Sequence, residues 1–351
     1  MLTPGTLPTQ RVSRGHGPVR ALPSRSSDVL SVPVSRYGGT RATVADVLAE
    51  THTDAFVIAR NGVVVASDGV LDRPQAVFSI TKSIVGCVAG ILVDRGVLEL
   101  DALVTSYVPE LTDSGYAGAT VRQVVDMRSG VHFEEDYADP RSDVQRLDRW
   151  LADKHALYDF LVTLRAEAPH GSRFLYRSAE TDVLGWVCER AAGAPMPELV
   201  SSLVWTPLGA QHDGEFLTDA DGTAVHDGGL AVTALDLMRF GLMLSDQPTW
   251  LRRAWAVDAQ ARNDFLASPA EASFPGGWYR GQFWFRPGPH GNVLLCLGIH
   301  GQMLYVGRRT RTVCVKLSSS PDAQHPAHLQ DTLRAFDAIG ALTPWRRTSL
   351  I

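Results

Sequence analysis

A serine and a lysine three positions apart are the residues of this sequence best suited to chemistry. Ser79-Ile80-Thr81-Lys82 opens an apolar stretch whose 3–4 spacing predicts a helix over residues 79–96. Residues three apart lie on one face of a helix, so the hydroxyl and the amine can touch. A serine nucleophile needs an adjacent base, and a desolvated lysine can be that base. The spacing predicts Ser79 as nucleophile and Lys82 as base; the alternative is an N-cap serine and a solvated lysine.

The composition draws attention to the same lysine. Only Lys82, Lys154 and Lys316 are lysines among 33 basic residues, and the others are arginines, a skew that codon usage in a GC-rich genome explains. Arginine stays protonated in proteins, whereas a buried lysine can lose its proton. Lys154 fits a surface helix and Lys316 a strand, so neither is assigned a role.

Two further segments carry polar groups that could complete a site. Tyr176 precedes a predicted helix, where it is either a core-edge residue or a proton relay beside Lys82. Ser178 could donate a hydrogen bond to the substrate or to Lys82. Gly298 and Gly301 end a predicted strand and allow a ligand close to the backbone. An N–H from this strand could join that of Ser79 as an oxyanion hole, or the segment is a simple turn with His300 on the surface.

The elements that position these residues follow a clear order along the chain. Two β-prone runs flank Asn61-Gly62 and predict a hairpin. Helical periods dominate from about residue 100 to 245, and residues 293–317 read as three short strands in an antiparallel meander. A final helix is expected over residues 328–339. Strands at both ends of the chain, with helices between them, predict an α/β (α+β) fold with an inserted helical lobe.

The domain organisation expected from this order is one catalytic unit after a leader. Residues 1–36 are rich in Pro, Gly, Ser and Thr and predict a flexible leader, with an arm that binds nucleic acid as the alternative. The unit spans residues 37–345. Its α/β part comprises about 37–78 and 232–345, and its helical lobe about 79–231.

Composition excludes several classes of protein. With 45% hydrophobic and 20% charged residues the chain can build a large core. A net charge of −5 argues against nucleic acid as a partner. No apolar run spans a membrane, and the start lacks a signal segment, so we expect a cytoplasmic protein that binds no membrane. The cysteines at 87, 188, 296 and 314 are widely spaced, which predicts buried thiols and no metal site.

Taken together, the motifs resemble the penicillin-recognising serine hydrolases, which include class C β-lactamases, DD-peptidases and related esterases and amidases. The similarity covers about residues 50–342 and is greatest to the 6-aminohexanoate-dimer hydrolase and family VIII esterase branch. The segments that carry it are Ser79–Ser83, Met127–Gly130, Glu134–Pro140, Thr181–Trp186 and Gly298–Gln302. The resemblance implies an antiparallel sheet flanked by helices, with the active site between the sheet and the helical lobe.

The resemblance also implies roles for individual residues. Ser79 would be the nucleophile, Lys82 its base and Tyr176 the proton relay, while the amides of Ser79 and Ile299 would form the oxyanion hole. The residues it would bring to the substrate are Tyr137 as a closing tyrosine, Asp148 and Asp227 near a substrate amine, and Ser178, Gly298 and His300. It implies no cofactor.

Two departures shape the expected function. No lysine is followed two residues later by glycine, so the Lys-Thr-Gly motif of β-lactamases is missing, and Tyr176-Arg177-Ser178 replaces Tyr-x-Asn. We therefore expect a small non-β-lactam amide or ester as substrate and a neutral Lys82 as the base. The alternatives are a transacylase or amide synthase that passes the acyl group to an amine or alcohol, a β-lactamase, and a non-catalytic penicillin-binding sensor.

Overall fold

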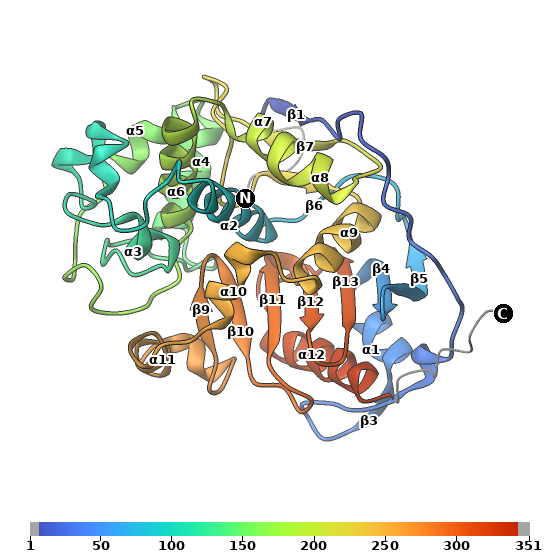
Figure 1. The fold of residues 1–351 in the computed structure, drawn as a ribbon. Coiled ribbons are helices and arrows are strands. Elements are labelled where there is room, and N and C mark those ends of the chain that lie inside the picture. Colours follow the sequence, from blue (N-terminus) through green and yellow to red (C-terminus); the bar gives the residue numbers. More distant parts are fainter. Residues whose placement is uncertain (1–6, 343–351) are drawn as a thin grey trace.

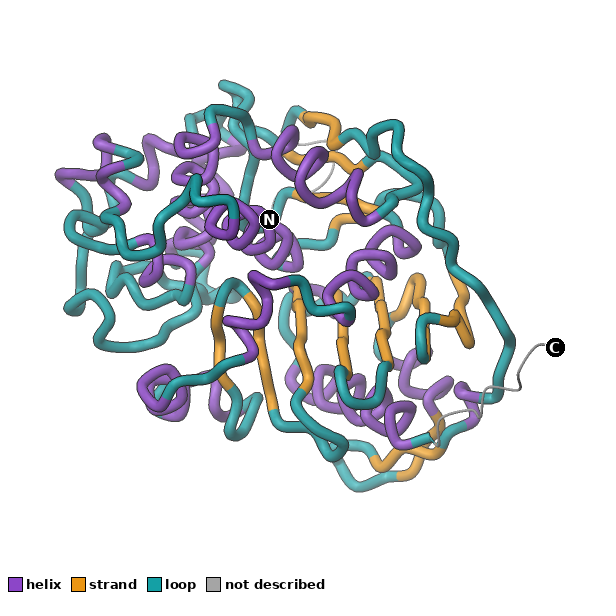
Figure 2. The backbone as a smooth tube through the Cα atoms, in the orientation of Figure 1, coloured by secondary structure: helices purple, strands orange, loops and turns teal. Residues whose placement is uncertain are grey.

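A seven-stranded antiparallel sheet forms the centre of the molecule in the computed structural model, which describes residues 7–342 (Figures 1 and 2). The strand order is β5-β4-β13-β12-β11-β10-β9. The strands are β4 (Thr53–Arg60), β5 (Val63–Gly69), β9 (Trp278–Arg280), β10 (Phe283–Arg286), β11 (Val293–Gly298), β12 (Gln302–Gly307) and β13 (Thr312–Ser318). Strand β13 pairs with β4, so the two ends of the chain close one sheet, as expected.

Helices cover both faces of this sheet (Figure 1). One face packs against α1 (Val44–Glu50) and α12 (Pro326–Ala341). The other packs against α2 (Ile80–Asp94), α9 (Ala234–Ser245) and α10 (Thr249–Trp255). Alternate residues of each strand enter two separate apolar cores, one per face, as the period of two in a strand requires.

The remaining helices form a lobe beside α2, and two small sheets complete the fold (Figure 1). The helices are α3 (Val121–Val125), α4 (Asp143–Ala152), α5 (Leu157–Leu161), α6 (Ser178–Ala192), α7 (Met196–Val200) and α8 (Thr206–Leu208), with α11 (Ala259–Leu266) near β9. One small sheet has the order β1-β7-β8-β6, from β1 (Thr9–Val12), β6 (Gln75–Ala76), β7 (Gly214–Leu217) and β8 (Leu230–Val232). The other pairs β2 (Pro33–Ser35) with β3 (Arg41–Thr43).

Helix α2 is the element that joins the lobe to the sheet. It is apolar on nearly all sides, and a helix of this kind is buried. It contacts α6 on one side and β10, β11 and β12 on the other. A Cβ at Gly86 would lie 2.5 Å from the Gly281 carbonyl oxygen, so only glycine permits this close approach. The packing fixes the position of the first turn of α2, where Ser79 lies.

The expected elements are present with small shifts of their ends. The hairpin turns at Asn61 and Gly62, both with positive φ (52° and 79°), as a two-residue type I′ turn requires. The meander is β11-β12-β13. The helical periods expected from about residue 100 to 245 correspond to helices that include α3, α5, α6 and α9. The four cysteines are buried and free, as predicted.

The described part of the expected leader does not have the structure of a flexible tail. Residues 9–12 form β1, which pairs with β7, and the side chain of Val12 is fully buried. The Arg14 amide donates to the Asp213 carboxylate at 2.8 Å. An alternating strand of four residues is too weak a pattern to stand out among the prolines and glycines. Residues 1–6 of the expected leader and the expected end of the unit at residue 345 lie outside the described residues.

Within residues 7–342, no helix is long and apolar enough to cross a membrane.

Candidate active site

Ser79 lies immediately before the first turn of α2. Phe78, which precedes it, has a φ of 47°, a left-handed conformation that is costly for an aromatic residue and that clusters at functional sites. The Ser79 side chain makes no capping hydrogen bond to the helix. Its Oγ instead accepts a hydrogen bond from the Lys82 Nζ at 3.0 Å. The geometry thus favours a hydroxyl available for chemistry over a helix cap.

Lys82 is buried, with 1% of its side chain exposed, and lies at the centre of a polar cluster. Its Nζ donates to the Asp227 backbone oxygen at 2.7 Å and lies 3.5 Å from the Asp227 Oδ2. Tyr176 lines the same cavity as Ser79, and the Lys82 Nζ is 5.4 Å from the centre of the tyrosine ring. The structure therefore brings Ser79, Lys82 and Tyr176 together.

The electrostatics of the cluster differ from the neutral Lys82 that the sequence predicted. Burial lowers the pKa of Lys82, but the charges of Tyr176, Asp227 and Glu135 oppose burial, and the net pKa is raised. Burial also raises the pKa of Tyr176, although the Lys82 charge acts in the opposite direction. The carboxylates of Asp227 and Glu135, which are distant from Lys82 in the sequence, therefore favour the protonated amine.

Asp227 belongs to this cluster and is only 16% exposed. Its amide donates to the Asp182 Oδ1 at 3.0 Å, and Asp182 is fully buried on α6. Burial raises the pKa of Asp182 well above its ordinary value, and the Asp227 charge adds to this shift. Asp227, which the resemblance places near a substrate amine, thus contacts the base itself.

Glu135 holds together a loop and a helix at the entrance to the site, and no separate role was predicted for it. It accepts hydrogen bonds from the Ser178 amide at 2.8 Å, from the Ser178 hydroxyl at 2.6 Å and from the Tyr137 hydroxyl at 2.6 Å. The Ser178 hydroxyl therefore points to Glu135 and not to Lys82. The run of three acids that precedes Tyr137 in the sequence was the only signal for this arrangement.

The end of β11 places a second backbone amide near Ser79. A short 3₁₀ turn, Ile299–Gly301, follows β11, and both Ser79 and Ile299 line the same cavity. A Cβ on Gly298 would lie 2.5 Å from the Val77 carbonyl oxygen, so glycine allows the strand this close to the segment before Ser79. Among the described residues, the amides of Ser79 and Ile299 donate no hydrogen bond to the protein. They are suited to an oxyanion.

His300 does not project freely from the surface. It has a φ of 61°, and its Nδ1 lies 2.7 Å from the Ser320 carbonyl oxygen. Its ring is 5.2 Å from the ring of Phe78, the residue before the nucleophile candidate. His300 therefore ties the turn after β11 both to the segment after β13 and to the start of α2.

The cavity at Ser79 has a volume of about 370 Å³. Ser79, Tyr137 and Tyr176 are among the residues that line it. Its lining also includes aromatic and aliphatic side chains, a lysine and two histidines, namely Phe174, Phe274, Trp284, Leu297, Leu329, Lys316, His325 and His328. Asp148 does not line it, but burial, with the charges of Asp227 and Glu135, raises the pKa of Asp148 to about 6.

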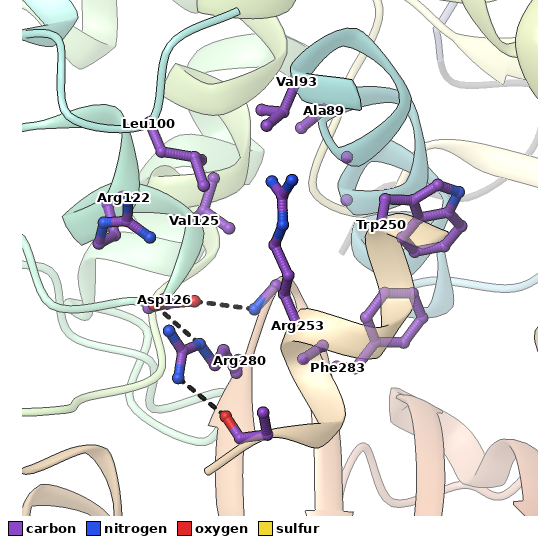
Figure 3. A pocket seen from close by; sticks show the side chains of 15 residues that line it. Ala89, Val93, Leu100, Arg122, Val125, Asp126, Trp250, Arg253, Arg280 and Phe283 are labelled. Atoms are coloured by element: carbon purple, nitrogen blue, oxygen red, sulfur yellow. Dashed lines mark hydrogen bonds and ion pairs between the residues drawn. The ribbon is translucent and has the colours of Figure 1, made fainter. Parts of the chain in front are cut away.

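A second cavity of about 270 Å³ lies along another side of α2 (Figure 3). It is lined by apolar side chains and by Arg122, Arg253 and Arg280, and Figure 3 shows Arg253 extending between its walls. Each arginine lies near an aspartate, at 2.8 Å for Arg122, 2.9 Å for Arg280 and 3.5 Å for Arg253. Asp126 also lines this cavity, but no serine, threonine, cysteine or lysine does, whereas the predicted nucleophile Ser79 lines the larger cavity.

Two lysines differ from expectation. Lys154 lies in the turn after α4, not in a surface helix. Lys316 is on a strand as predicted, but its side chain is 1% exposed and it lines the cavity. The sequence did not reveal this because strand position alone does not say which face a sheet buries. Within residues 7–342, no group of three or more His, Cys, Asp or Glu could hold a metal ion.

Comparisons with known proteins agree with this geometry. The β-lactamase family profile matches residues 40–338. The chain is 36% identical to the 6-aminohexanoate-dimer hydrolase of Paenarthrobacter ureafaciens, over 92% of this chain and 89% of that protein. It is 33% identical to esterase EstB of Burkholderia gladioli, over 49% of this chain and 50% of the esterase.

Solved structures show the same fold. A Bacillus anthracis protein proposed to be a 6-aminohexanoate-dimer hydrolase superposes with a TM-score of 0.80 at 23% identity, over 92% of this chain and 88% of that one. EstCE1, described as a hydrolase with promiscuous acyltransferase activity, superposes with a TM-score of 0.65 at 17% identity, over 84% of this chain and 98% of that one.

Proposed function

The chain belongs to the β-lactamase family, and we propose that it is a serine hydrolase that cleaves a small amide or ester through an acyl-enzyme on Ser79. The observation that carries this proposal is the 3.0 Å hydrogen bond between the Ser79 Oγ and the Lys82 Nζ, with the centre of the Tyr176 ring 5.4 Å from the same Nζ. The relatives named for an amide dimer and for ester hydrolysis support these two substrate classes.

The acylation step needs the Lys82–Tyr176 pair with one proton fewer than in the empty site. That form accepts the Ser79 proton while Oγ attacks the carbonyl carbon, and the carbonyl π electrons move to oxygen. The resulting oxyanion is held by the amides of Ser79 and Ile299. Tyr176 then returns the proton to the leaving nitrogen or oxygen as the tetrahedral intermediate collapses. Acid–base assistance of this kind is worth about 10²–10⁴ in rate.

Deacylation reuses the same groups in the reverse order. Water gives a proton to the Lys82–Tyr176 pair and attacks the acyl carbon, and the pair returns that proton to the Ser79 Oγ as the acid leaves. No step needs a metal or a redox partner, since the atoms and charges balance with these side chains and water alone.

The substrate we propose is an amide or ester with an apolar segment and no β-lactam ring. Much of the cavity lining is aromatic and aliphatic. Cys296 and Leu297, not lysine and threonine, precede Gly298 on β11, so the usual cation for a β-lactam carboxylate is missing from this strand. We expect poor turnover of nitrocefin, and turnover as fast as that of a simple ester would contradict this substrate class.

Asp148, Asp227 and Tyr137 belong to the same proposal. Burial, together with the charges of Asp227 and Glu135, raises the pKa of Asp148 to about 6, and a substrate amine nearby would favour its ionised form. Tyr137, held by Glu135, lines the cavity from a loop that could close over a bound amide. Changing Asp148 to asparagine should raise KM for a substrate with an amine more than for a neutral ester, and an equal effect on both would contradict this role.

The experiment that tests the function is hydrolysis of p-nitrophenyl esters by the wild type and by Ser79→Ala. We expect the variant to lose activity by several orders of magnitude while it stays folded. Equal activity in both proteins would refute the mechanism. Stable acylation without release of acid would indicate the alternative of a penicillin-binding sensor.

Acyl transfer is the second candidate, because it uses the same acyl-enzyme with an amine or alcohol in place of water. EstCE1 shares only the fold with this chain, so an acceptor assay must decide. Hydrolysis predicts free acid as the product with or without candidate amines, whereas an amide product would favour the transferase. A cytoplasmic location is part of the proposal, and cell fractionation tests it.

A further inference from the structure

Lys316 is a buried cation that the proposed mechanism does not use. It lies on β13, and the side chain of Cys314, two residues earlier, belongs to the core on the α1 and α12 face of the sheet. Three oxygen acceptors surround its Nζ: the Thr51 carbonyl at 2.9 Å, the Gly301 carbonyl at 3.4 Å and the Ser318 hydroxyl. An ammonium has three protons to donate, so this site matches the charged form of lysine.

The Gly301 contact connects Lys316 to the candidate oxyanion hole. Gly301 ends the short turn that begins with Ile299, which lines the cavity together with Ser79 and whose amide is the second predicted donor of the oxyanion hole. Gly301 has a φ of 87°, so its conformation depends on glycine and on the contacts that hold it. A Cβ at this position would lie 3.3 Å from the Lys316 Nζ, which shows how closely the amine and the turn are packed.

The other two carbonyls of the turn are also held from the β13 side. The Gln302 Nε2 lies 3.3 Å from the Ile299 carbonyl, and the Ser320 amide donates to the His300 carbonyl at 3.2 Å. Gln302 is itself fixed by two hydrogen bonds to the backbone of Ser318, at 2.6 and 3.0 Å. Lys316 is thus one of three side-chain or backbone donors that hold the turn, and the only ionisable one among them.

We propose that Lys316 is a positioning residue for the oxyanion hole. Its amine holds the Gly301 carbonyl and thereby fixes the turn that presents the Ile299 amide. This inference rests on the proposed function. It explains why a lysine is retained on a buried strand, where a charge is costly unless hydrogen bonds compensate it.

The charge on Lys316 is sensitive to its surroundings. Burial lowers the pKa of Lys316 to about 7, and the Asp54 charge opposes this shift. The other titratable groups nearby are His52, His325 and His328, and burial, these neighbouring histidines and the Lys316 charge all lower the pKa of His328. A neutral amine has two protons for three acceptors, so the longest contact, to Gly301, is the one expected to be lost as the pH rises.

The test compares an oxoester with the thionoester of the same acid, in which sulfur replaces the carbonyl oxygen. Sulfur accepts hydrogen bonds poorly, so the ratio of kcat/KM for the two substrates reports on the oxyanion hole, and the shared base cancels. The proteins are the wild type, Lys316→Met, Lys316→Arg and the control Lys154→Met, which changes an exposed lysine that does not line the cavity.

We expect Lys316→Met to lower kcat for the oxoester. Removal of an oxyanion donor typically lowers kcat by about 10²–10³, and the loss in this variant should approach that value. KM and the thionoester rate should change little, so the ratio falls. Lys316→Arg should restore much of the ratio, and Lys154→Met should leave it unchanged. In the wild type the ratio should fall as the pH rises through about 7.

A folded Lys316→Met protein that slows both substrates equally would overturn the inference, and so would a wild-type ratio that is constant between pH 6 and 9. If Lys316→Met does not fold, the wild-type pH series decides alone. Failure of the proposed function gives a different result, because ester hydrolysis would then survive in Ser79→Ala.

Discussion

Changing Asp227 to asparagine should move the pH dependence of hydrolysis to lower pH. The Asp227 Oδ2 lies 3.5 Å from the Lys82 Nζ, and its charge raises the pKa of Lys82. Removing that charge destabilises the ammonium, so the pKa of Lys82 falls. The base then loses its proton at a lower pH, and the rising limb of the pH–rate profile shifts to lower pH.

The size of the shift follows from the distance. Two unit charges 3.5 Å apart interact by about 1 kcal/mol at the dielectric constant of water and by about 5 kcal/mol at an effective value of 20. One pKa unit corresponds to about 1.4 kcal/mol, so the rising limb should move to lower pH by about 1–3.5 units. The Asp227→Asn variant can keep the backbone contact at 2.7 Å, because that contact uses the main-chain oxygen.

The assay is kcat/KM for a neutral p-nitrophenyl ester between pH 6 and 10, corrected for spontaneous hydrolysis. Asp72→Asn, which changes an exposed aspartate outside the cluster around Lys82, is the matched control and should leave the limb unmoved. A limb that stays in place in Asp227→Asn, or moves to higher pH, would refute the electrostatic reasoning. A higher KM with an unmoved limb would show that Asp227 acts on the substrate and not on the base.

Three further changes give separate outcomes. Tyr176→Phe should lower kcat by about 10²–10⁴ with little change in KM, since it removes the proton relay; a fall of less than tenfold by steady-state kinetics would contradict the relay. Glu135→Gln should lower the local stability of the Tyr137 loop by about 1.5–3 kcal/mol, because it removes the charge to which Tyr137 and Ser178 donate hydrogen bonds. Hydrogen exchange of the loop amides measures this loss. Unchanged protection would show that Glu135 does not hold the loop to the helix. Gly86→Ala should destabilise the protein by about 1–3 kcal/mol, since a Cβ there meets a main-chain oxygen at 2.5 Å; denaturant unfolding measures this, and an unchanged midpoint would show that α2 can shift.

The sequence predicted the elements whose patterns are local and strong. The hairpin at Asn61, the apolar helix after Ser79 and the strand that ends at Gly298 all depend on spacing that is visible within a few residues. The contacts between these elements could not be predicted in the same way. Residues 79, 176, 227 and 299 are distant in the sequence and come together only in the folded chain.

The charges of the site could not be predicted for the same reason. A neutral Lys82 is reasonable for a buried amine, but Tyr176, Asp227 and Glu135 approach it from distant parts of the chain and raise its pKa. Lys316 shows the opposite case, since its amine is buried and its pKa is lowered although a strand position suggested nothing unusual. In both cases the pattern predicted the element and the packing decided the direction of the pKa shift.

The segment before residue 37 illustrates a different difficulty. Its composition is that of a flexible leader, yet β1 adds to the sheet of β7 and β8. A short edge strand needs only four residues, and its stability comes from a partner more than 200 residues away, so local composition carries little information about it.

The most direct test of the central claim is to locate the covalent intermediate. The protein is treated with a fluorophosphonate, digested and examined by mass spectrometry. We predict a single adduct, on the Ser79 hydroxyl, which forms slowly in Tyr176→Phe and not at all in Ser79→Ala. An adduct on another residue, or none in a protein that hydrolyses esters, would contradict a serine mechanism at Ser79.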